Sequence, residues 1–100
     1  MAYLIVWEFQ VPPEKRDGFI RRYASDGDWA RLFGRSSEYQ GTELLHDEAD
    51  PERFYTIDRW CCAGAWDRFR QTFAADYEAL DRRCEGLTRI ERRLAGGVAT

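Results

Sequence analysis

The sequence has 100 residues, of which 44% are hydrophobic and 15% aromatic, and a net charge of -3 at pH 7. A chain of this length folds around one hydrophobic core, so we expect a single domain at residues 1 to 96 and a flexible tail at residues 97 to 100. Acidic and basic residues are interspersed, which argues against a protein that binds nucleic acid. No stretch reaches the roughly 18 apolar residues of a membrane span, and the first residues lack the basic region of a secretory signal. We therefore expect a cytoplasmic protein that does not insert into membranes.

A strand is expected first, at residues 2 to 11, which are rich in β-forming residues. Every second residue is apolar and contributes to one continuous face: Tyr3, Ile5, Trp7, Phe9 and Val11. Prolines follow directly. Because proline is tolerated in a first helical turn, the sequence predicts a helix at residues 13 to 24.

A short helix is expected next, between Asp28, which can cap it, and Gly34, which can end it. Trp29, Leu32 and Phe33 fall on one face at helical spacing. A connecting segment has little need of three large apolar side chains. We therefore expect this helix to fold over the core as a lid.

Two further strands are predicted at residues 38 to 46 and 53 to 62, joined in a hairpin by a polar turn. Gly41 indicates a bulge in the first of them. The second carries large apolar groups and a charge on each face. Phe54, Thr56, Asp58 and Trp60 point one way, and Tyr55, Ile57 and Arg59 point the other.

One long helix is predicted at residues 63 to 84, where apolar residues recur at steps of three and four: Trp66, Phe69, Phe73, Tyr77, Leu80 and Cys84. Gly86 ends it, and a last strand follows at residues 87 to 94. The order of elements predicts an α+β, ferredoxin-like βαββαβ fold with a four-stranded antiparallel sheet and both helices on one face. Because the uncovered face would carry Leu4 and Val6, we expect it to pack on a second copy, giving a homodimer.

The chain resembles the antibiotic biosynthesis monooxygenase domain of the dimeric α/β-barrel superfamily over residues 2 to 95. The stretches that carry the resemblance are VWEFQVPPEKRDGFI, YQGTELL and YTIDRWCCAGAWDRF. The resemblance implies oxidation of an aromatic polyketide or quinol-type substrate by O2, with neither metal nor flavin as cofactor. Typical members carry a histidine nine residues after the tryptophan that ends the third strand, where this chain has Phe69. A haem-degrading activity, which needs an axial histidine on that helix, is not expected.

Oxidation of a phenol requires an aromatic pocket, a group that takes the phenolic proton and a donor that stabilises the anion. The candidate walls of a pocket for a small aromatic ligand are Trp29, Phe33, Trp66 and Tyr77. Plain core packing is the competing interpretation, and it applies least to Trp29, which lies in a connector.

Three polar residues are candidates for catalysis. His46 is the only histidine, the residue type whose unperturbed pKa lies near neutrality. Asp58 and Arg59 lie on a strand where charges are costly unless paired. The competing interpretations are a solvated surface histidine and a structural ion pair, with Glu8 as one possible partner across the dimer. No metal-ligand cluster or phosphate-binding loop appears, so we expect no metal.

Cys61, Cys62 and Cys84 are an odd number of cysteines without metal-ligand spacing. A redox switch is one interpretation, but we expect buried, reduced thiols. Two other functions remain open. One is a non-catalytic dimer that binds a small hydrophobic molecule, and the other is an RNA-recognition motif, which has the same order of elements but needs basic surroundings that this acidic chain lacks.

Overall fold

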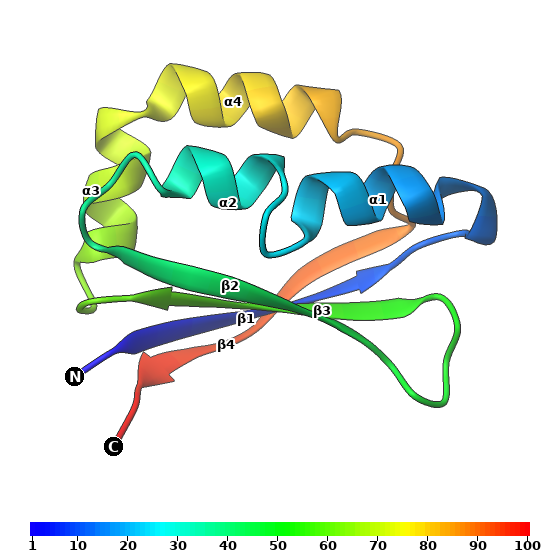
Figure 1. The fold of residues 1–100 in the computed structure, drawn as a ribbon, viewed down its shortest axis with the longest axis horizontal. Helices are drawn as coiled ribbons and strands as arrows, with labels where there is room; N and C mark the ends of the chain where they lie inside the picture. The colour runs from blue at the N-terminus through cyan, green and yellow to red at the C-terminus, as the bar shows by residue number, and fades with distance from the viewer.

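A computed structural model describes residues 1 to 100 as a four-stranded antiparallel sheet with all the helices on one of its faces (Figure 1). The strands lie in the order β2-β3-β1-β4. The elements in chain order are β1 (Tyr3–Gln10), the 3-10 helix η1 (Pro13–Lys15), α1 (Arg16–Tyr23), α2 (Asp28–Phe33), β2 (Tyr39–His46), β3 (Arg53–Trp60), α3 (Ala65–Thr72), α4 (Ala74–Arg83) and β4 (Ile90–Val98). The predicted α+β, ferredoxin-like βαββαβ fold is confirmed. None of the helices has the length and apolar character that a membrane span requires.

Strand β3 turns its alternating residues to two different environments. Its pairing with β1 places Asp58 opposite Ile5, Thr56 opposite Trp7 and Phe54 opposite Phe9. Phe54, Thr56, Asp58 and Trp60 are all buried beneath the helices. The alternate residues Tyr55, Ile57 and Arg59 therefore lie on the open face of the sheet.

Helix α2 covers the core, as the lid prediction required. Trp29, Ala30, Leu32 and Phe33 are all buried. The ring of Phe33 packs edge-on against Trp66 and Phe69, with ring centroids 5.6 and 5.2 Å apart. The bulge predicted at Gly41 is also present, since the β2-β3 register shifts between Tyr39 and Gly41, and the φ angle of Gly41 is 125°.

The single long helix predicted at residues 63 to 84 is wrong, because the chain leaves helical geometry at Phe73, with φ -114° and ψ 31°. Figure 1 shows α3 standing at the end of the sheet and α4 running across it. This bend lets Trp66 and Phe69 of α3 pack on Trp60 at the end of β3, with centroids 5.7 and 5.5 Å from its ring. A straight helix could not also lay Tyr77 against Trp29, at 5.2 Å.

Strand β4 starts and ends later than the predicted residues 87 to 94. Its end is later because Gly96 and Gly97 continue the pairing with β1, opposite Ile5 and Leu4. Two residues of the expected tail, Gly97 and Val98, thus belong to the strand. Ala99 N–H donates to the carbonyl oxygen of Ala2 at 2.8 Å. The two ends of the chain therefore lie side by side (Figure 1).

Phe69 lies at the centre of the aromatic core and is 2% exposed. Its ring contacts those of Trp60, Phe33 and Trp66. Phe69 occupies the position at which the family that this chain resembles typically has a histidine. Here the residue at that position packs in the core.

Truncating this side chain should be costly. We expect Phe69→Ala to lower the free energy of unfolding by about 3 to 5 kcal/mol, because the neighbouring rings cannot close the cavity that it leaves. The control Ile20→Ala, at a side chain 37% exposed on α1, should cost less than about 1.5 kcal/mol. Urea unfolding measures both. Equal unfolding midpoints for Phe69→Ala and the wild type would contradict this description of the core.

Candidate functional site

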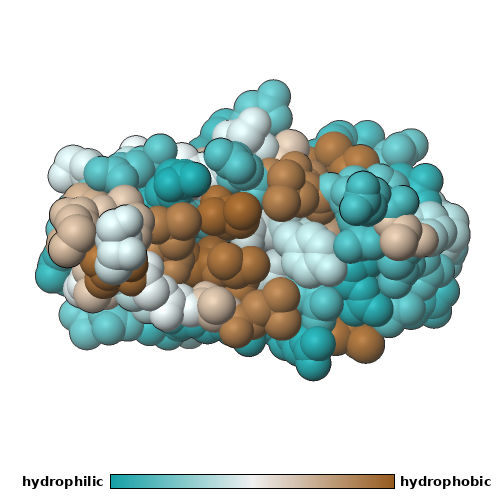
Figure 2. Space-filling view, turned by 90° about the horizontal axis from the view of Figure 1, so that it is seen from below, coloured by the Kyte–Doolittle hydropathy of each residue, from teal (hydrophilic) through white to brown (hydrophobic).

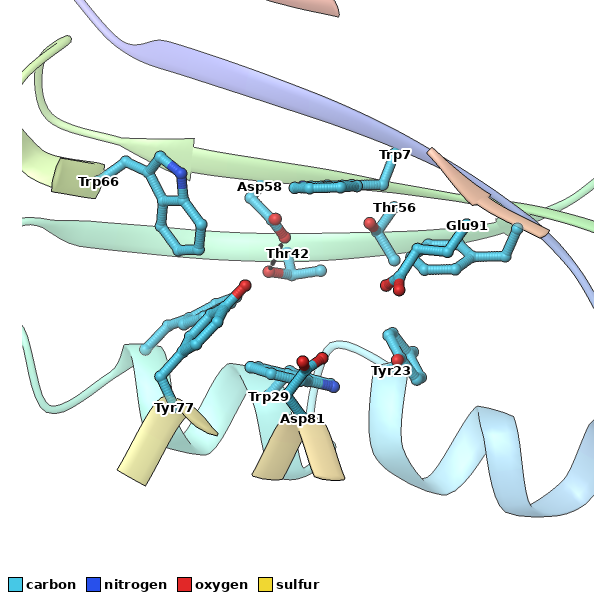
Figure 3. Close-up of a pocket in the computed structure, with 12 residues that line it drawn as sticks. Trp7, Tyr23, Trp29, Thr42, Thr56, Asp58, Trp66, Tyr77, Asp81 and Glu91 are labelled. Atoms are coloured by element: carbon cyan, nitrogen blue, oxygen red, sulfur yellow. Dashed lines mark hydrogen bonds between the residues drawn. The ribbon is translucent and has the colours of Figure 1, made fainter. Parts of the chain in front are cut away.

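A cavity lies between the sheet and the helices and opens to solvent. Its volume is about 50 Å³, which corresponds to about three to five water molecules. Figure 3 shows side chains reaching into it from both layers. They are mostly aromatic, with a few polar groups: Trp7, Phe9, Tyr23, Trp29, Phe33, Thr42, Thr56, Asp58, Trp66, Tyr77, Asp81 and Glu91.

Asp58 lies on the sheet side of the cavity and is the most deeply buried of its carboxyl groups. Its residue is 5% exposed, and burial raises the pKa of the carboxyl to about 6. The hydroxyl of Thr42 donates to one carboxylate oxygen at 2.7 Å, and the hydroxyls of Thr42 and Tyr39 lie 2.5 Å apart. The other carboxylate oxygen has no hydrogen-bond partner. Asp58 is therefore held in place and still has an oxygen free to accept a proton.

Hydrogen-bond donors line the opposite side of the cavity. The indole nitrogen of Trp29 is buried and makes no hydrogen bond of regular geometry, and it lies near the Tyr23 hydroxyl and the Cys84 thiol. Burial raises the pKa of the Tyr23 and Tyr77 hydroxyls, so both stay protonated at neutral pH. None of the twelve lining residues is a cation, so an anion formed here would rely on these neutral donors.

Two more carboxyl groups, Asp81 of α4 and Glu91 of β4, belong to the lining (Figure 3). Burial and the charge of Asp81 raise the pKa of Glu91. The cavity therefore has several acidic groups and no basic one, which favours a neutral ligand over an anionic one.

The structure brings five of the seven residues proposed from the sequence to this cavity: Trp29, Phe33, Trp66, Tyr77 and Asp58. The guanidinium of Arg70 lies 5.0 Å from the ring of Trp66 and covers it. The four aromatic residues also pack on each other, so the two interpretations of them, core packing and pocket wall, are both compatible with their positions.

His46 and Arg59 do not line the cavity. The ring of His46 is exposed and stacks on Phe54, with centroids 4.3 Å apart, and its Nε2 lies 2.9 Å from the carbonyl oxygen of Pro51. Arg59 lies on the open face, 3.9 Å from Glu43. The structure therefore separates both residues from Asp58.

Several lining residues were not anticipated, above all Trp7, Thr42 and Thr56, together with Tyr23 and Glu91. Trp7 and Thr56 share a face with Asp58 through the β1-β3 register. The alternation of residues along the two strands could therefore have predicted that they lie near Asp58. For Thr42 the signal was weaker, because its direction depends on the bulge at Gly41.

Three potential metal ligands meet outside the cavity, where atoms of Glu38, Cys61 and Cys62 lie within 4.8 Å of one another. Cys61 and Cys62 are partly exposed, so the expectation of buried thiols is wrong for these two and holds for Cys84. Arg68 already binds both oxygens of Glu38, at 2.9 and 2.6 Å.

A ferredoxin-like domain with an aromatic cavity between sheet and helices defines the structural class. The family model described as antibiotic biosynthesis monooxygenase matches residues 2–79, and the chain belongs to this family. No curated protein sequence matches it.

Solved structures from three organisms share the fold. PA3566 from Pseudomonas aeruginosa is 16% identical, with a TM-score of 0.70 over 99% of this chain and 94% of its own. A Bordetella bronchiseptica protein named for the same family is 16% identical, with a TM-score of 0.76 over 99% and 97%. SnoaB from Streptomyces nogalater, described as a cofactor-independent oxygenase, is 20% identical, with a TM-score of 0.65 over 99% and 93%.

The raised pKa of Asp58 should make stability depend on pH. A folded-state pKa near 6, against an ordinary value of 3.8, means that the stabilising contribution of the protonated group is complete below about pH 4 and is lost as the pH rises through about 6. Asp58→Asn stays neutral, so its advantage in unfolding free energy over the wild type should grow between pH 4 and pH 7 by on the order of 3 kcal/mol.

Two neighbouring variants check the cause. Thr42→Val removes the hydrogen bond that opposes the rise in the Asp58 pKa. It should therefore raise the pH at which the stabilising contribution of Asp58 is half lost, whereas Thr42→Ser should leave that pH unchanged. Denaturant unfolding at a series of pH values measures all of these. A constant difference between Asp58→Asn and the wild type across the range would contradict the assignment.

Proposed function

We propose that this protein is a small cofactor-independent monooxygenase that oxidises a phenolic or quinol-type aromatic substrate with O2 in the cavity around Asp58. The observation that carries the proposal is the buried carboxyl with one unpaired oxygen, set in an aromatic lining. Membership of the antibiotic biosynthesis monooxygenase family supports the class of reaction. An aromatic polyketide with a phenolic ring is a larger substrate than a simple quinol and would undergo the same oxidation.

Asp58 would act as the proton acceptor. Its pKa of about 6 leaves the carboxylate ionised at neutral pH but more basic than an exposed aspartate. The indole N–H of Trp29, which forms no hydrogen bond of regular geometry with the Tyr23 hydroxyl and Cys84 thiol near it, would donate to the substrate oxygen. The phenolate formed in this way is far easier to oxidise than the phenol.

The reaction balances with the substrate as the only reductant. Asp58 takes the phenolic proton, a ring carbon that bears hydrogen and lies ortho or para to the oxygen forms a bond to O2, and Asp58 returns the proton to the peroxide formed. Loss of the hydrogen on that carbon then breaks the O–O bond, giving a carbonyl and water. One oxygen atom of O2 ends in the quinone and the other in water.

Substrate entry requires side chains to move. A volume of about 50 Å³ is below the roughly 300 Å³ at which ligand pockets begin. Trp29 on the short α2 and Tyr77 on α4 lie side by side on the helix side of the cavity (Figure 3), with ring centroids 5.2 Å apart. Their separation would open room for an aromatic ring.

Oxygen uptake with a panel of hydroquinones and hydroxyanthrones tests the function. We expect uptake above the autoxidation rate, with kcat/KM rising with pH around 6, and a loss of about 100-fold or more in Asp58→Asn. The matched control Glu43→Gln, on the open face, should retain full activity. His46→Gln should retain it too, because His46 lies outside the cavity.

A non-catalytic protein that binds a small hydrophobic molecule is the second candidate. The observation that favours it is the lack of any cation among the lining residues, together with Phe69 in the place of the family histidine. Ligand binding by the wild type and by Asp58→Asn with equal affinity, and no uptake of O2 above autoxidation, would establish this function and exclude the first.

We also propose that the open face of the sheet joins two copies in a homodimer. Figure 2 shows hydrophobic side chains gathered in the middle of this face. The register and exposure assign it these apolar residues: Leu4, Val6, Leu45, Tyr55, Ile57 and Ile90. Glu8 already pairs with Arg92 at 2.6 Å and with Arg53 at 3.5 Å. A second copy would therefore cover apolar surface without having to neutralise a free carboxylate.

Ile57→Lys should dissociate such a dimer, because the two copies would bring two positive charges together at the centre of a buried interface. Light scattering of the wild type at micromolar concentration should give twice the chain mass of 11.8 kDa, and Ile57→Lys should give 11.8 kDa. Ile20→Lys, on the outer side of α1, is the control and should remain dimeric. A folded wild type at the mass of one chain would refute the dimer.

A further inference from the structure

The adjacent cysteines at the end of β3 form a second chemical centre that the proposed oxidation does not use. The two sulfur atoms of Cys61 and Cys62 lie 3.1 Å apart. Both residues are partly exposed, whereas the third cysteine, Cys84, is buried. The centre lies between the strand that carries Asp58 and the helix that carries Trp66, and it shares no residue with the cavity lining.

Arg68 and Glu38 hold this pair in a defined arrangement. The Arg68 guanidinium donates to Cys62 Sγ at 3.1 Å and to the two oxygens of Glu38 at 2.9 and 2.6 Å. Cys61 Sγ–H lies 3.4 Å from Glu38 Oε2, and the Cys61 backbone N–H donates to the Glu38 carbonyl oxygen at 2.9 Å. Gly64 leaves the space that the guanidinium occupies, since a Cβ there would lie 2.6 Å from Arg68 Nη1.

The two thiols are therefore unequal. Cys62 Sγ accepts from the Arg68 guanidinium at 3.1 Å, whereas Cys61 Sγ has no cation beside it and lies 3.4 Å from a Glu38 oxygen. The same oxygen lies farther from Cys62 Sγ, at 3.7 Å. Cys62 thus has the features of a reactive cysteine, namely a neighbouring cation and access to solvent, and Cys61 stands beside it as the second thiol.

We propose that Cys61 and Cys62 form a hydroperoxide-reactive dithiol, in which Cys62 is the attacking sulfur and Cys61 the resolving one. In the first step the Cys62 thiolate bonds to one oxygen of the peroxide, the O–O bond breaks, and the leaving hydroxide takes a proton to become water. In the second step Cys61 sulfur attacks the sulfenic acid, the S–O bond breaks, and the hydroxide leaves as water with the Cys61 proton. Two thiols are oxidised and one peroxide is reduced to two molecules of water.

The product would be a disulfide between neighbours in the chain, which closes a strained eight-membered ring. Strained, accessible disulfides are easily reduced, so the modification would be reversible. It would also withdraw Cys62 from Arg68 and so alter the first turns of α3, the helix that carries Trp66.

Mass spectrometry of the oxidised protein tests the proposal. The wild type is treated with a stoichiometric amount of hydrogen peroxide, quenched with catalase, unfolded and alkylated with iodoacetamide. We expect a chain lighter by two hydrogen atoms in which only Cys84, of the three cysteines, is alkylated. Dithiothreitol should restore alkylation of all three.

Variants assign the two roles. Cys61→Ser should stop at a Cys62 sulfenic acid that dimedone traps, Cys62→Ser should react no faster than a free thiol, and Cys84→Ser should behave as the wild type. Arg68→Gln should move the midpoint of the pH-rate profile upward, because it removes the cation beside Cys62. Arg70→Gln, on the same helix but paired with Asp67, is the matched control and should leave the profile unchanged.

Three results would overturn the proposal: oxidation of Cys84 as fast as that of the pair, disulfides between separate chains, or a product that gains oxygen and keeps both sulfurs apart. Circular dichroism of each variant before treatment ensures that a loss of reactivity is not a loss of the fold. The thiol readout needs no aromatic substrate, so its outcome is independent of the proposed monooxygenase function.

Discussion

The burial of the Asp58 carboxyl is the constraint around which the site is built. A carboxylate on the helix-covered side of a central strand loses most of its hydration, and the hydrogen bond from Thr42 compensates only in part, so its pKa rises to about 6. Burying an asparagine or valine at this position would cost less folding free energy than burying the carboxylate. The chain keeps an unfavourable acid at a place where aromatic side chains from α2, α3 and α4 line a cavity. Such a cost to stability is typical of positions retained for chemistry.

The fold could be predicted from the sequence because its signals are local. Alternation in β1 and β3 and the helical spacing of Trp29, Leu32 and Phe33 specify which faces are buried. The break at Phe73 could not be predicted, since the apolar steps of three and four continue through it and only packing on Trp60 shows that the helix must turn. The length of β4 was missed because Gly96 and Gly97 are typical of a chain end, whereas here they pair with β1.

The site was less accessible to sequence reasoning. Asp58 could be singled out because a charge in an apolar strand is unusual, but its partners come from β1 and β2 and depend on the pairing register and on the bulge near Gly41. His46 was a candidate only because histidine as a residue type has an unperturbed pKa near neutrality. The structure stacks its ring on Phe54 at the turn end of the β2-β3 hairpin, away from the cavity. The dithiol was visible in the sequence as two adjacent cysteines. Only the fold brings Glu38 and Arg68 to them.

The most direct test of the central claim is an NMR titration of the Asp58 side-chain carboxyl carbon in the folded wild type. A carboxyl desolvated within the cavity should titrate with a midpoint near 6, and its chemical shift should respond to an aromatic ligand added at neutral pH. A midpoint at the ordinary value of 3.8, unaffected by such a ligand, would show that water reaches this carboxyl freely and would contradict the account of the site.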